Sequence, residues 1–458
     1  MKTEHSSDVA IIGAGIAGIA AAYFLLQENS ELSVLLIDRD QPMNFTSAQS
    51  GDNYRNWWPH PIMTAFTNDS IKLMESLASS SNVINMTRRG YLLASRRPDI
   101  SELVTDLYTG YGSEKEVRLH TSESVPSYQP ALSPDWQSAP DGVDVLMNEH
   151  LVRRYFPNLD SSVSNVIHIR RAGDFSGQQM GQFMLEKIKA AGGRRLTAEV
   201  LDIQREQDYR LELRTATETR TLRTEQLVIA AGPYTTDLSA MLGINLPIEN
   251  TFQQKIAFED TRAVVPRQQP FAIDLDEAKL EWSADEQDWL RSEPELSWLT
   301  NRIVGGIHCR PEGGDNARWL KLGWAYNTTI SEPKDKWIDE PQFDQQFPEI
   351  VMRGASILQP SLRPYVSDFP SRFSHYGGYY SMTKENWPLI GPLDGSGAFV
   401  LGALSGFGSM ASCGAGSLIA KQITNKDLPV YAHNLGLGRY SDAHLMNELA
   451  NSPSRGIL

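Results

Sequence analysis

Two short apolar runs near the N-terminus are separated by a glycine-rich turn and an alanine-rich segment. Residues 8–12 form the first run and residues 32–37 the second, and both have the length and continuous apolar character of buried parallel strands. Residues 19–27, between them, are rich in helix formers. The order of strand, turn, helix and strand predicts a βαβ unit at the start of an α/β domain.

Later segments repeat the combination of an apolar strand and a turn of small residues. Residues 198–203 and 209–214 alternate like strands of a meander, and residues 224–238 contain an apolar strand that runs into an Ala-Ala-Gly turn. Within residues 397–423, a strand precedes a glycine-rich turn and a helix of small residues. A second helix N-terminus is therefore expected near the end of the chain, where it would stabilise an oxyanion or an electron-rich ring oxygen.

The stretch WLKLGWAY, residues 319–326, has the alternation of a β-strand, with Lys321 among apolar neighbours. A solvent-facing lysine on an edge strand explains this pattern, because lysines are rarely buried without a partner. A buried lysine with a chemical role is the alternative.

The composition is that of an ordinary globular protein. The chain has 458 residues, of which 41% are hydrophobic and 21% charged, so two or three domains with sizeable cores are expected. The net charge is −14 and the basic residues form no cluster, which argues against nucleic acid as a partner. Residues 260–299 look like an additional acidic segment.

Cysteine and histidine usage excludes several kinds of site. Cys309 and Cys413 are far apart and form no CxxC motif, which fits a reducing, cytoplasmic location. The nine histidines show no HExxH-like spacing, so we expect no metal site. The chain also contains neither a GxSxG elbow nor a GxxxxGK[ST] phosphate loop.

The apolar segment of residues 9–26 is long enough to suggest a membrane helix or a signal peptide. Glu4 and Asp8 precede it, glycines interrupt its first third, and no basic flank follows. We therefore expect no membrane span.

Glycines at positions 13, 15 and 18 form the pattern G-x-G-x-x-G between the first strand and the helix. The first permits a tight turn, the second lets the backbone approach a pyrophosphate, and the third allows close packing of helix and strand. Asp38 ends the second strand, at the distance from the glycines where an acid binds the adenosine ribose. This predicts a dinucleotide site without distinguishing NAD from FAD. The expected contacts in this unit are Gly13, Ala14, Gly15, Ile16, Ala17, Gly18, Asp38 and Arg39.

Four motifs occur in order along the chain. They are GAGIAG with Asp38, the LVIAAG turn, YYSMTKENWPLIG at 379–391 and LGALSGFGSMASCGAG at 401–416. Together they resemble the D-amino-acid oxidase (DAO) superfamily of FAD-dependent oxidoreductases. The resemblance is greatest to the sarcosine oxidase and N-methyl amino acid oxidase branch. It implies FAD bound at further contacts, namely Ser50, Gly51, Val200, Ala231, Gly232, Gly402, Ser405, Gly406, Phe407, Gly408, Ser409 and Met410.

The resemblance also implies an α/β fold, α+β overall, of the glutathione-reductase type. A Rossmann-like FAD-binding domain is expected beside a substrate domain with an antiparallel sheet. We expect the FAD-binding domain to comprise residues 1–90, 171–245 and 375–430. The substrate domain would take residues 91–170 and 246–374, and residues 431–458 would form a C-terminal extension.

WLKLGWAY matches the sarcosine oxidase pattern LKLGY, which carries a lysine beside the flavin. The resemblance therefore gives Lys321 the role of promoting the reaction of reduced flavin with oxygen. The physical basis is that a fixed cation stabilises superoxide as it forms.

The substrate side departs from the family. Gly51 and Asp52 match its loop, but Arg55 matches only with an insertion. The family's carboxylate-binding arginine falls on Trp57 or Trp58, and its lysine on Met410. Neither residue type can replace a bidentate arginine. Either Arg55 or another arginine such as Arg363 takes over, or the substrate lacks an α-carboxylate there.

Aromatic residues offer a second way to hold an amine, since aromatic faces attract cations. Lys321, Tyr380 and Arg55 are the expected catalytic residues, with Tyr380 or Tyr326 orienting the amine. The expected substrate contacts are Trp57, Trp58, Trp324 and Tyr326. The alternative is that these aromatic residues belong to the core.

Gly378 stands where monomeric sarcosine oxidases carry the cysteine that bonds the flavin. We therefore expect non-covalent FAD, unless a histidine such as His60 serves.

The sequence thus predicts an FAD-dependent oxidase of a C–N bond in a secondary, N-methyl or cyclic amine or amino acid. An imine forms and hydrolyses to a carbonyl compound and an amine, and molecular oxygen becomes hydrogen peroxide. An amine or 2-hydroxy-acid dehydrogenase that uses a quinone or carrier-protein acceptor is one alternative. A flavin-binding subunit without independent turnover is the other. The sequence does not indicate the oligomeric state.

Overall fold

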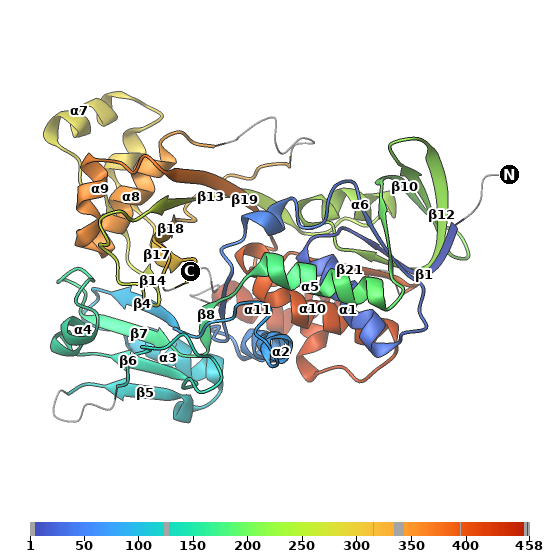
Figure 1. Cartoon of the computed structure of the whole chain (residues 1–458), viewed down its shortest axis with the longest axis horizontal. Coiled ribbons are helices and arrows are strands. Elements are labelled where there is room, and N and C mark those ends of the chain that lie inside the picture. The colour runs from blue at the N-terminus through green and yellow to red at the C-terminus, as the bar shows by residue number, and fades with distance from the viewer. Residues whose placement is uncertain are drawn as a thin grey trace.

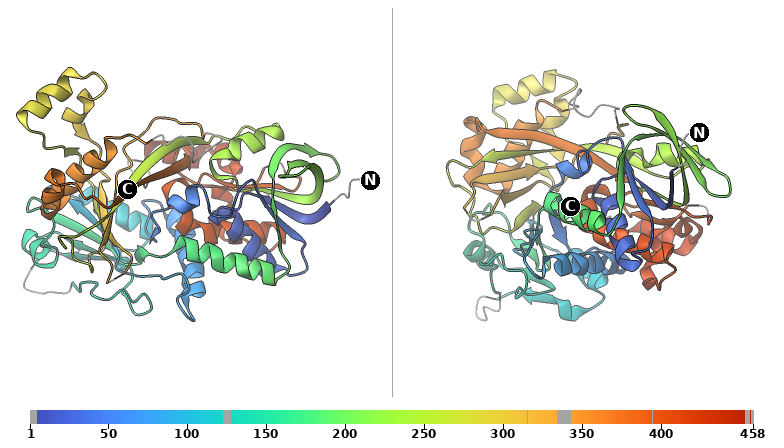
Figure 2. Two further views of the ribbon diagram at one scale, coloured as in Figure 1. Left: turned by 45° about the horizontal axis from the view of Figure 1, so that its top comes forward. Right: turned by 45° about the vertical axis from the view of Figure 1, so that its right-hand side comes forward.

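The structure is a computed structural model that describes residues 5–122, 128–314, 316–333, 343–393, 395–452 and 456. It is built around two large β-sheets that lie next to each other along the long axis of the molecule (Figure 1). Two further views show the same arrangement (Figure 2).

The first sheet has eight strands and a parallel centre. β12, β1, β2 and β9 pair in parallel, and β21 joins β12 in the same direction, while β10, β11 and β20 add antiparallel pairs. Its strands are β1 (His5–Ile12), β2 (Val34–Asp38), β9 (Arg194–Thr197), β10 (Glu199–Arg205), β11 (Tyr209–Arg214), β12 (Thr219–Ile229), β20 (Leu389–Pro392) and β21 (Ala398–Gly402).

β1 explains why the first apolar run is continuous. Val9 and Ile11 pack on one face of the sheet in the largest apolar cluster, which includes helices α1, α2, α5 and α10. Ala10 and Ile12 pack on the opposite face, against the β10–β12 meander and α6. A strand covered on both faces needs apolar residues at every position.

The second sheet has nine strands and is mixed. Most neighbours are antiparallel, but β14–β4 and β5–β6 are parallel. Its strands, in spatial order, are β19 (Phe373–Met382), β13 (Glu249–Glu259), β18 (Trp319–Gly323), β17 (His308–Glu312), β14 (Phe271–Asp274), β4 (Tyr91–Ser95), β7 (Asn165–Ile169), β6 (Val143–Leu146) and β5 (Val117–His120). The predicted α/β architecture with two sheets is confirmed, and the second sheet is mixed rather than purely antiparallel.

Helices cover both sheets, and two short ladders complete the fold. The ladders are β3 (Asn53–Arg55) with β8 (Ala172–Asp174), and β15 (Ala278–Lys279) with β16 (Arg302–Ile303). The helices are α1 (Ile16–Glu28), α2 (Pro61–Ala78), α3 (Ser101–Tyr111), α4 (Glu149–Tyr155), α5 (Gly177–Ala190), α6 (Thr235–Met241), α7 (Ala284–Ser292), α8 (Phe347–Leu358), α9 (Arg363–Ser367), α10 (Gly408–Ile423) and α11 (Ala443–Asn451).

Two segments singled out by the sequence have clear places. Residues 9–26 divide between β1 and α1, and no helix in the described ranges is long and apolar enough to cross a membrane. The acidic segment carries α7, which projects from the end of the molecule at the upper left of Figure 1. The predicted domain boundaries stay a prediction.

Candidate active site

The turn between β1 and α1 admits only glycine at two positions. Gly13 has φ of +109°, and a Cβ there would lie 2.3 Å from the carbonyl oxygen of Ala230, the residue after β12. A Cβ at Gly18 would lie 1.9 Å from the oxygen of Gly13. The glycine turn, the start of α1 and the end of β12 therefore lie too close together for any side chain between them, as a phosphate-binding turn requires.

The carboxylate of Asp38 stabilises the same turn through hydrogen bonds. One of its carboxylate oxygens accepts a hydrogen bond from the backbone N–H of Ala14 at 2.6 Å, and the other accepts one from Asp40 at 3.0 Å. Burial raises the pKa of Asp38 above its ordinary value, although these two bonds and Arg39 oppose the shift. The carboxylate lines the cavity described next, and its bond to a ribose stays a prediction.

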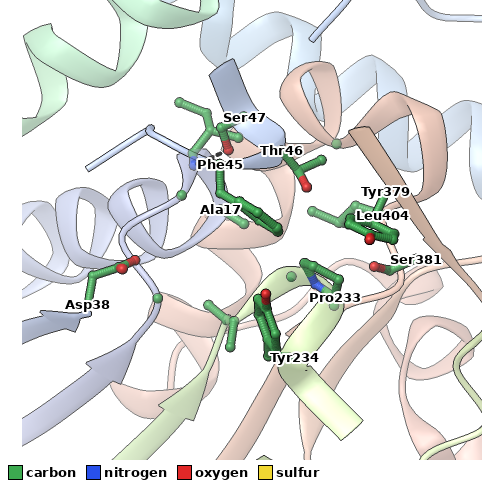
Figure 3. A pocket seen from close by; sticks show the side chains of 18 of the residues that line it. Ala17, Asp38, Phe45, Thr46, Ser47, Pro233, Tyr234, Tyr379, Ser381 and Leu404 are labelled. Atoms are coloured by element: carbon green, nitrogen blue, oxygen red, sulfur yellow. Dashed lines mark hydrogen bonds between the residues drawn. The ribbon is translucent and has the colours of Figure 1, made fainter. Parts of the chain in front are cut away.

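A cavity of about 650 Å³ extends from this turn toward the second sheet. In Figure 3, Asp38 lies on one side of it and Tyr379, Ser381 and Leu404 lie on the other, with Pro233 and Tyr234 facing Phe45 and Thr46 across the space. The predicted cofactor contacts that line it are Gly13, Gly15, Ile16, Ala17, Asp38, Arg39, Ser50, Gly51, Val200, Ala231, Gly232, Gly402, Ser405, Gly406, Gly408 and Ser409. Segments far apart in sequence thus converge on one elongated space.

Four predicted cofactor contacts do not line the cavity. Gly18 packs against Gly13, and Ala14 contributes its backbone N–H to Asp38. Phe407 packs edge-on against Trp58 at 4.7 Å, and the sulfur of Met410 accepts the backbone N–H of Arg55 at 3.4 Å. These residues support the wall from behind.

The start of α10 closes one side of the cavity. The turn before it holds Ala403 and Ser405 at φ of 53° and 49°, in the left-handed region that residues with a Cβ rarely occupy. The hydroxyls of Ser409 and Ser50 are 2.8 Å apart and join α10 to the loop on the opposite side. The helix therefore presents its positive end to the cavity.

Several lining residues were not predicted from the sequence. Phe45 and Tyr234 stand 5.7 Å apart between ring centroids, and Phe45 lies 6.1 Å from Tyr379. The hydroxyl of Ser47 accepts the backbone N–H of Ile16 at the first turn of α1. No sequence signal marks these residues, because loops and strands from distant segments bring them together.

Lys321 lies on β18 between β13 and β17, so the edge-strand interpretation is wrong. Its Nζ is 2.9 Å from a carboxylate oxygen of Glu312 and donates to the carbonyl of Gly51 at 3.3 Å. Arg310 contacts the same two groups, at 2.7 and 2.9 Å. Burial lowers the pKa of Lys321, as does Arg310, while Glu312 and Asp52 oppose the shift. Lys321 does not line the cavity, and its predicted role beside a flavin stays a prediction.

The guanidinium of Arg55 is hydrogen-bonded to backbone carbonyls of the protein. Its Nε donates to the carbonyl of Trp57 at 3.1 Å, and its Nη2 donates to the carbonyl of Gly456 at 2.7 Å. The guanidinium carbon lies 4.6 Å from the centroid of Trp58, and burial lowers the pKa of Arg55 to about 10. Arg363, the other candidate, is more than half exposed and pairs with Glu281. Neither arginine lines the cavity.

The five predicted aromatic contacts do not form one surface. Trp58 packs in the apolar cluster of the first sheet, and Trp57 in a cluster of the second. Trp324 is 1% exposed and packs with Tyr326 under α8. The alternation of β18 explains this, because Leu320, Leu322 and Trp324 point away from the face that carries Lys321. Only Tyr380 of the five lines the cavity, so the core interpretation fits Trp324 and Tyr326.

Two positions bear on covalent attachment. Gly378 lines the cavity, and a Cβ there would lie 3.3 Å from the Cβ of Gln49. His60 caps α2, pairs with Glu448 and packs on Trp387, and it does not line the cavity. Non-covalent binding stays a prediction.

Lys255 on β13 was missed by the sequence reasoning. Its side chain is 6% exposed and lines the cavity, with Nζ 5.5 Å from the ring centroid of Tyr380. The available signal was the alternation of residues 252–259, FQQKIAFE, which places the lysine opposite the apolar Ile256 and Phe258.

Comparisons with known proteins agree with this geometry. The family model DAO, described as FAD dependent oxidoreductase, matches residues 8–422. No curated protein matches the chain. The structure is similar to L-proline dehydrogenase from P. horikoshii, with 15% identity, a TM-score of 0.70 and 96% of this chain and 99% of that chain covered.

Two oxidases are also similar. Glycine oxidase from Geobacillus kaustophilus has 16% identity and a TM-score of 0.67, with 95% of this chain and 99% of that chain covered. Iminodiacetate oxidase from Chelativorans sp. BNC1 has 16% identity and a TM-score of 0.64, with 93% and 98% covered. At these identities the similarity concerns the fold.

Proposed function

The chain belongs to the DAO family of FAD-dependent oxidoreductases, and from that premise we propose that it oxidises a C–N bond in a secondary, N-methyl or cyclic amine or amino acid. FAD, when bound, supplies the two-electron acceptor for this chemistry. The observation that carries the proposal is the cavity itself, which runs from a glycine turn with an acid beside it to a wall of Tyr380 and Lys255. Its first part would hold the adenosine and pyrophosphate of a dinucleotide, and its far end would hold the flavin ring and the substrate.

Different parts of the cavity wall would bind different parts of FAD. The glycine turn at Gly13 and Gly15 and the start of α1 would hold the pyrophosphate, and Asp38 the adenosine ribose. The start of α10, with Ser405 and Gly406, would face the flavin ring with its positive end.

The chain would act on the amine mainly by position and by excluding water. Tyr380 lines the far end, and its ring lies against Gly406, where a Cβ would be 2.5 Å from the ring. This close packing fixes the ring, so its hydroxyl can orient an amine nitrogen. A site from which water is excluded favours the uncharged amine, which is the form that can lose hydride from its α-carbon. The imine that results hydrolyses to a carbonyl compound and an amine.

Oxygen is the proposed final acceptor, taking two electrons and two protons to become hydrogen peroxide. Similarity to structures named glycine oxidase and iminodiacetate oxidase supports oxidation of amines with oxygen. Similarity to a structure named L-proline dehydrogenase favours a second candidate, a dehydrogenase that passes electrons to a quinone or a carrier protein. The sarcosine oxidase branch and non-covalent FAD are part of the first proposal.

The test is anaerobic mixing of the purified yellow protein with a panel of secondary, N-methyl and cyclic amines, with and without carboxylates. Loss of the visible flavin absorption identifies the substrate. Admitting air then separates the two candidates, since an oxidase recovers its absorption and forms one peroxide per turnover. Slow recovery in air with rapid turnover on a dye acceptor favours the dehydrogenase. Failure of every amine to reduce the flavin would refute C–N oxidation and leave a 2-hydroxy-acid dehydrogenase or a binding subunit.

A further inference from the structure

Lys255 occupies an interior position on the face of the second sheet that looks toward the cavity. Its neighbours in sequence, Ile256 and also Phe258, point into the apolar cluster under α8. Alternation therefore turns Lys255 to the other face, where it lines the cavity beside Tyr380. It lies between β18 and β19, opposite Gly323 on one side and Tyr376 on the other.

The ammonium of Lys255 has no anionic partner among the described residues. Its Nζ lies over the face of the Tyr380 ring, 5.5 Å from the ring centroid. An aromatic face compensates a buried cation only in part. A lysine that is 6% exposed is therefore placed for an anion that the protein itself does not supply.

The neighbouring cationic side chains already have partners within the protein. Lys321 pairs with Glu312 and holds the carbonyl of Gly51, and Arg310 does the same. Arg55 is bonded to the carbonyls of Trp57 and Gly456. None of these three lines the cavity, so Lys255 is the cation at its Tyr380 end.

The glycine at position 323 leaves room for the imidazole of His308 beside Lys255. A Cβ there would lie 2.3 Å from Nε2 of His308 and 3.2 Å from Cγ of Lys255. The Nδ1 of His308 bonds the carbonyl of Gly306 at 2.9 Å, and burial lowers the pKa of His308 to about 4. The imidazole is therefore neutral at pH 7, and its Nε2 is an acceptor. This neighbour of Lys255 is therefore uncharged and supplies no anion to its ammonium.

We propose that Lys255 binds the carboxylate of the substrate, so that the enzyme acts on amino acids rather than on simple amines. This rests on the proposed function and assigns a carboxylate site to β13. The ammonium donates to the carboxylate in a place from which water is excluded, where a charge-assisted hydrogen bond is strong. Arg55, held by Gly456, takes no part.

The test compares the FAD-loaded wild type with Lys255→Met, Lys255→Arg and Lys426→Met. Lys426 is exposed beyond α10 and serves as the matched control for loss of one positive charge. Benzoate is the unreactive carboxylate probe, and its dissociation constant is read from the change in visible flavin absorption. L-proline and pyrrolidine, which differ by the carboxylate, are the reactive pair.

Benzoate should bind the wild type and Lys426→Met equally, and Lys255→Met at least about tenfold more weakly. Lys255→Arg should retain most of the affinity, which separates loss of the charge from misfolding. Lys255→Met should also reduce the preference for L-proline over pyrrolidine in anaerobic flavin reduction. Unchanged benzoate binding in Lys255→Met overturns the proposal, and so does a variant that is slowed only in its reaction with oxygen.

The experiment can refute the carboxylate site and the proposed function independently of each other. If no amine reduces the flavin, C–N oxidation is refuted while benzoate binding still reports on Lys255. If pyrrolidine reduces the wild type and Lys255→Met equally well and benzoate binds neither, the oxidation stands and the carboxylate site does not.

Discussion

Replacing Lys321 with methionine removes a buried ammonium and leaves the side chain close to its original length. In the wild type this ammonium is 2.9 Å from Glu312 and 3.3 Å from the carbonyl of Gly51, and its side chain is 11% exposed. The structure therefore indicates that Lys321 holds the second sheet to the loop that lines the cavity. The variant should therefore be less stable than the wild type.

The magnitude follows from the surroundings of Glu312. Coulomb attraction at 2.9 Å is about 6 kcal/mol at an effective dielectric constant near 20. Desolvation of the ammonium offsets much of this, and removing one member of a buried pair typically costs about 3–5 kcal/mol. Glu312 keeps Arg310 at 2.7 Å and is 35% exposed, which reduces the cost further. We expect a loss of about 2 kcal/mol in the free energy of unfolding, which is below that typical cost.

The assay is urea unfolding of the FAD-loaded protein, followed by tryptophan fluorescence, for Lys321→Met, Glu312→Gln and the double variant. A double-mutant cycle should give a coupling energy of about 1–2 kcal/mol between the two residues. Stopped-flow mixing of the reduced proteins with oxygen is measured in parallel. A coupling energy near zero, together with an oxygen reaction slowed at unchanged stability, would refute the structural role. That result would instead support the role that the family resemblance gives Lys321.

Three further outcomes are expected. Gly18→Ala places a Cβ 1.9 Å from the oxygen of Gly13, so the purified protein should be colourless, and a full flavin-to-protein ratio would contradict this. Asp38→Ala removes the acceptor for the N–H of Ala14 as well as the ribose acceptor, so the dissociation constant for FAD, measured by fluorescence titration of the apoprotein, should rise roughly ten- to hundredfold. Burial lowers the pKa of His308 to about 4, below its unfolded value near 6.5, so only the unfolded state takes up the proton between these values. The contribution of His308 to the free energy of unfolding should thus be fully present above pH 6.5, and up to about 3 kcal/mol of it should be lost toward pH 4. Urea unfolding at several pH values should show a smaller loss in His308→Gln.

The parts of the molecule that the sequence predicts well are those set by local chemistry. The glycines at positions 13 and 18 are required by contacts within one βαβ unit and its neighbouring strand, and their spacing is visible in the chain. The predicted strand at residues 209–214 coincides with β11, because its alternation is decided by one buried face. The helix predicted at residues 19–27 begins earlier, at Ile16, since the glycine turn already supplies its first residues.

The parts that escaped prediction depend on which face of a strand meets which neighbour. Alternation shows that Lys321 and Trp324 point to opposite sides of β18, but only the order of strands shows that Trp324 faces α8. The same order shows that Lys321 meets Glu312 from β17 rather than solvent. Lys255 carried the same alternating signal, yet nothing local distinguishes a lysine at a cavity from one at the surface.

The loop at Ser50 and Gly51 shows why cofactor binding and the second sheet depend on each other. Ser50 is joined to Ser409 at the start of α10, while the carbonyl of Gly51 accepts hydrogen bonds from Arg310 and Lys321 on β17 and β18. Both loop residues line the cavity, so the wall around the cofactor is closed only when the second sheet is in place. A ligand that binds this closed form alone must stabilise the contacts that form it. FAD should therefore stabilise the second sheet as well as the first, although its phosphate-binding turn belongs to the first sheet alone.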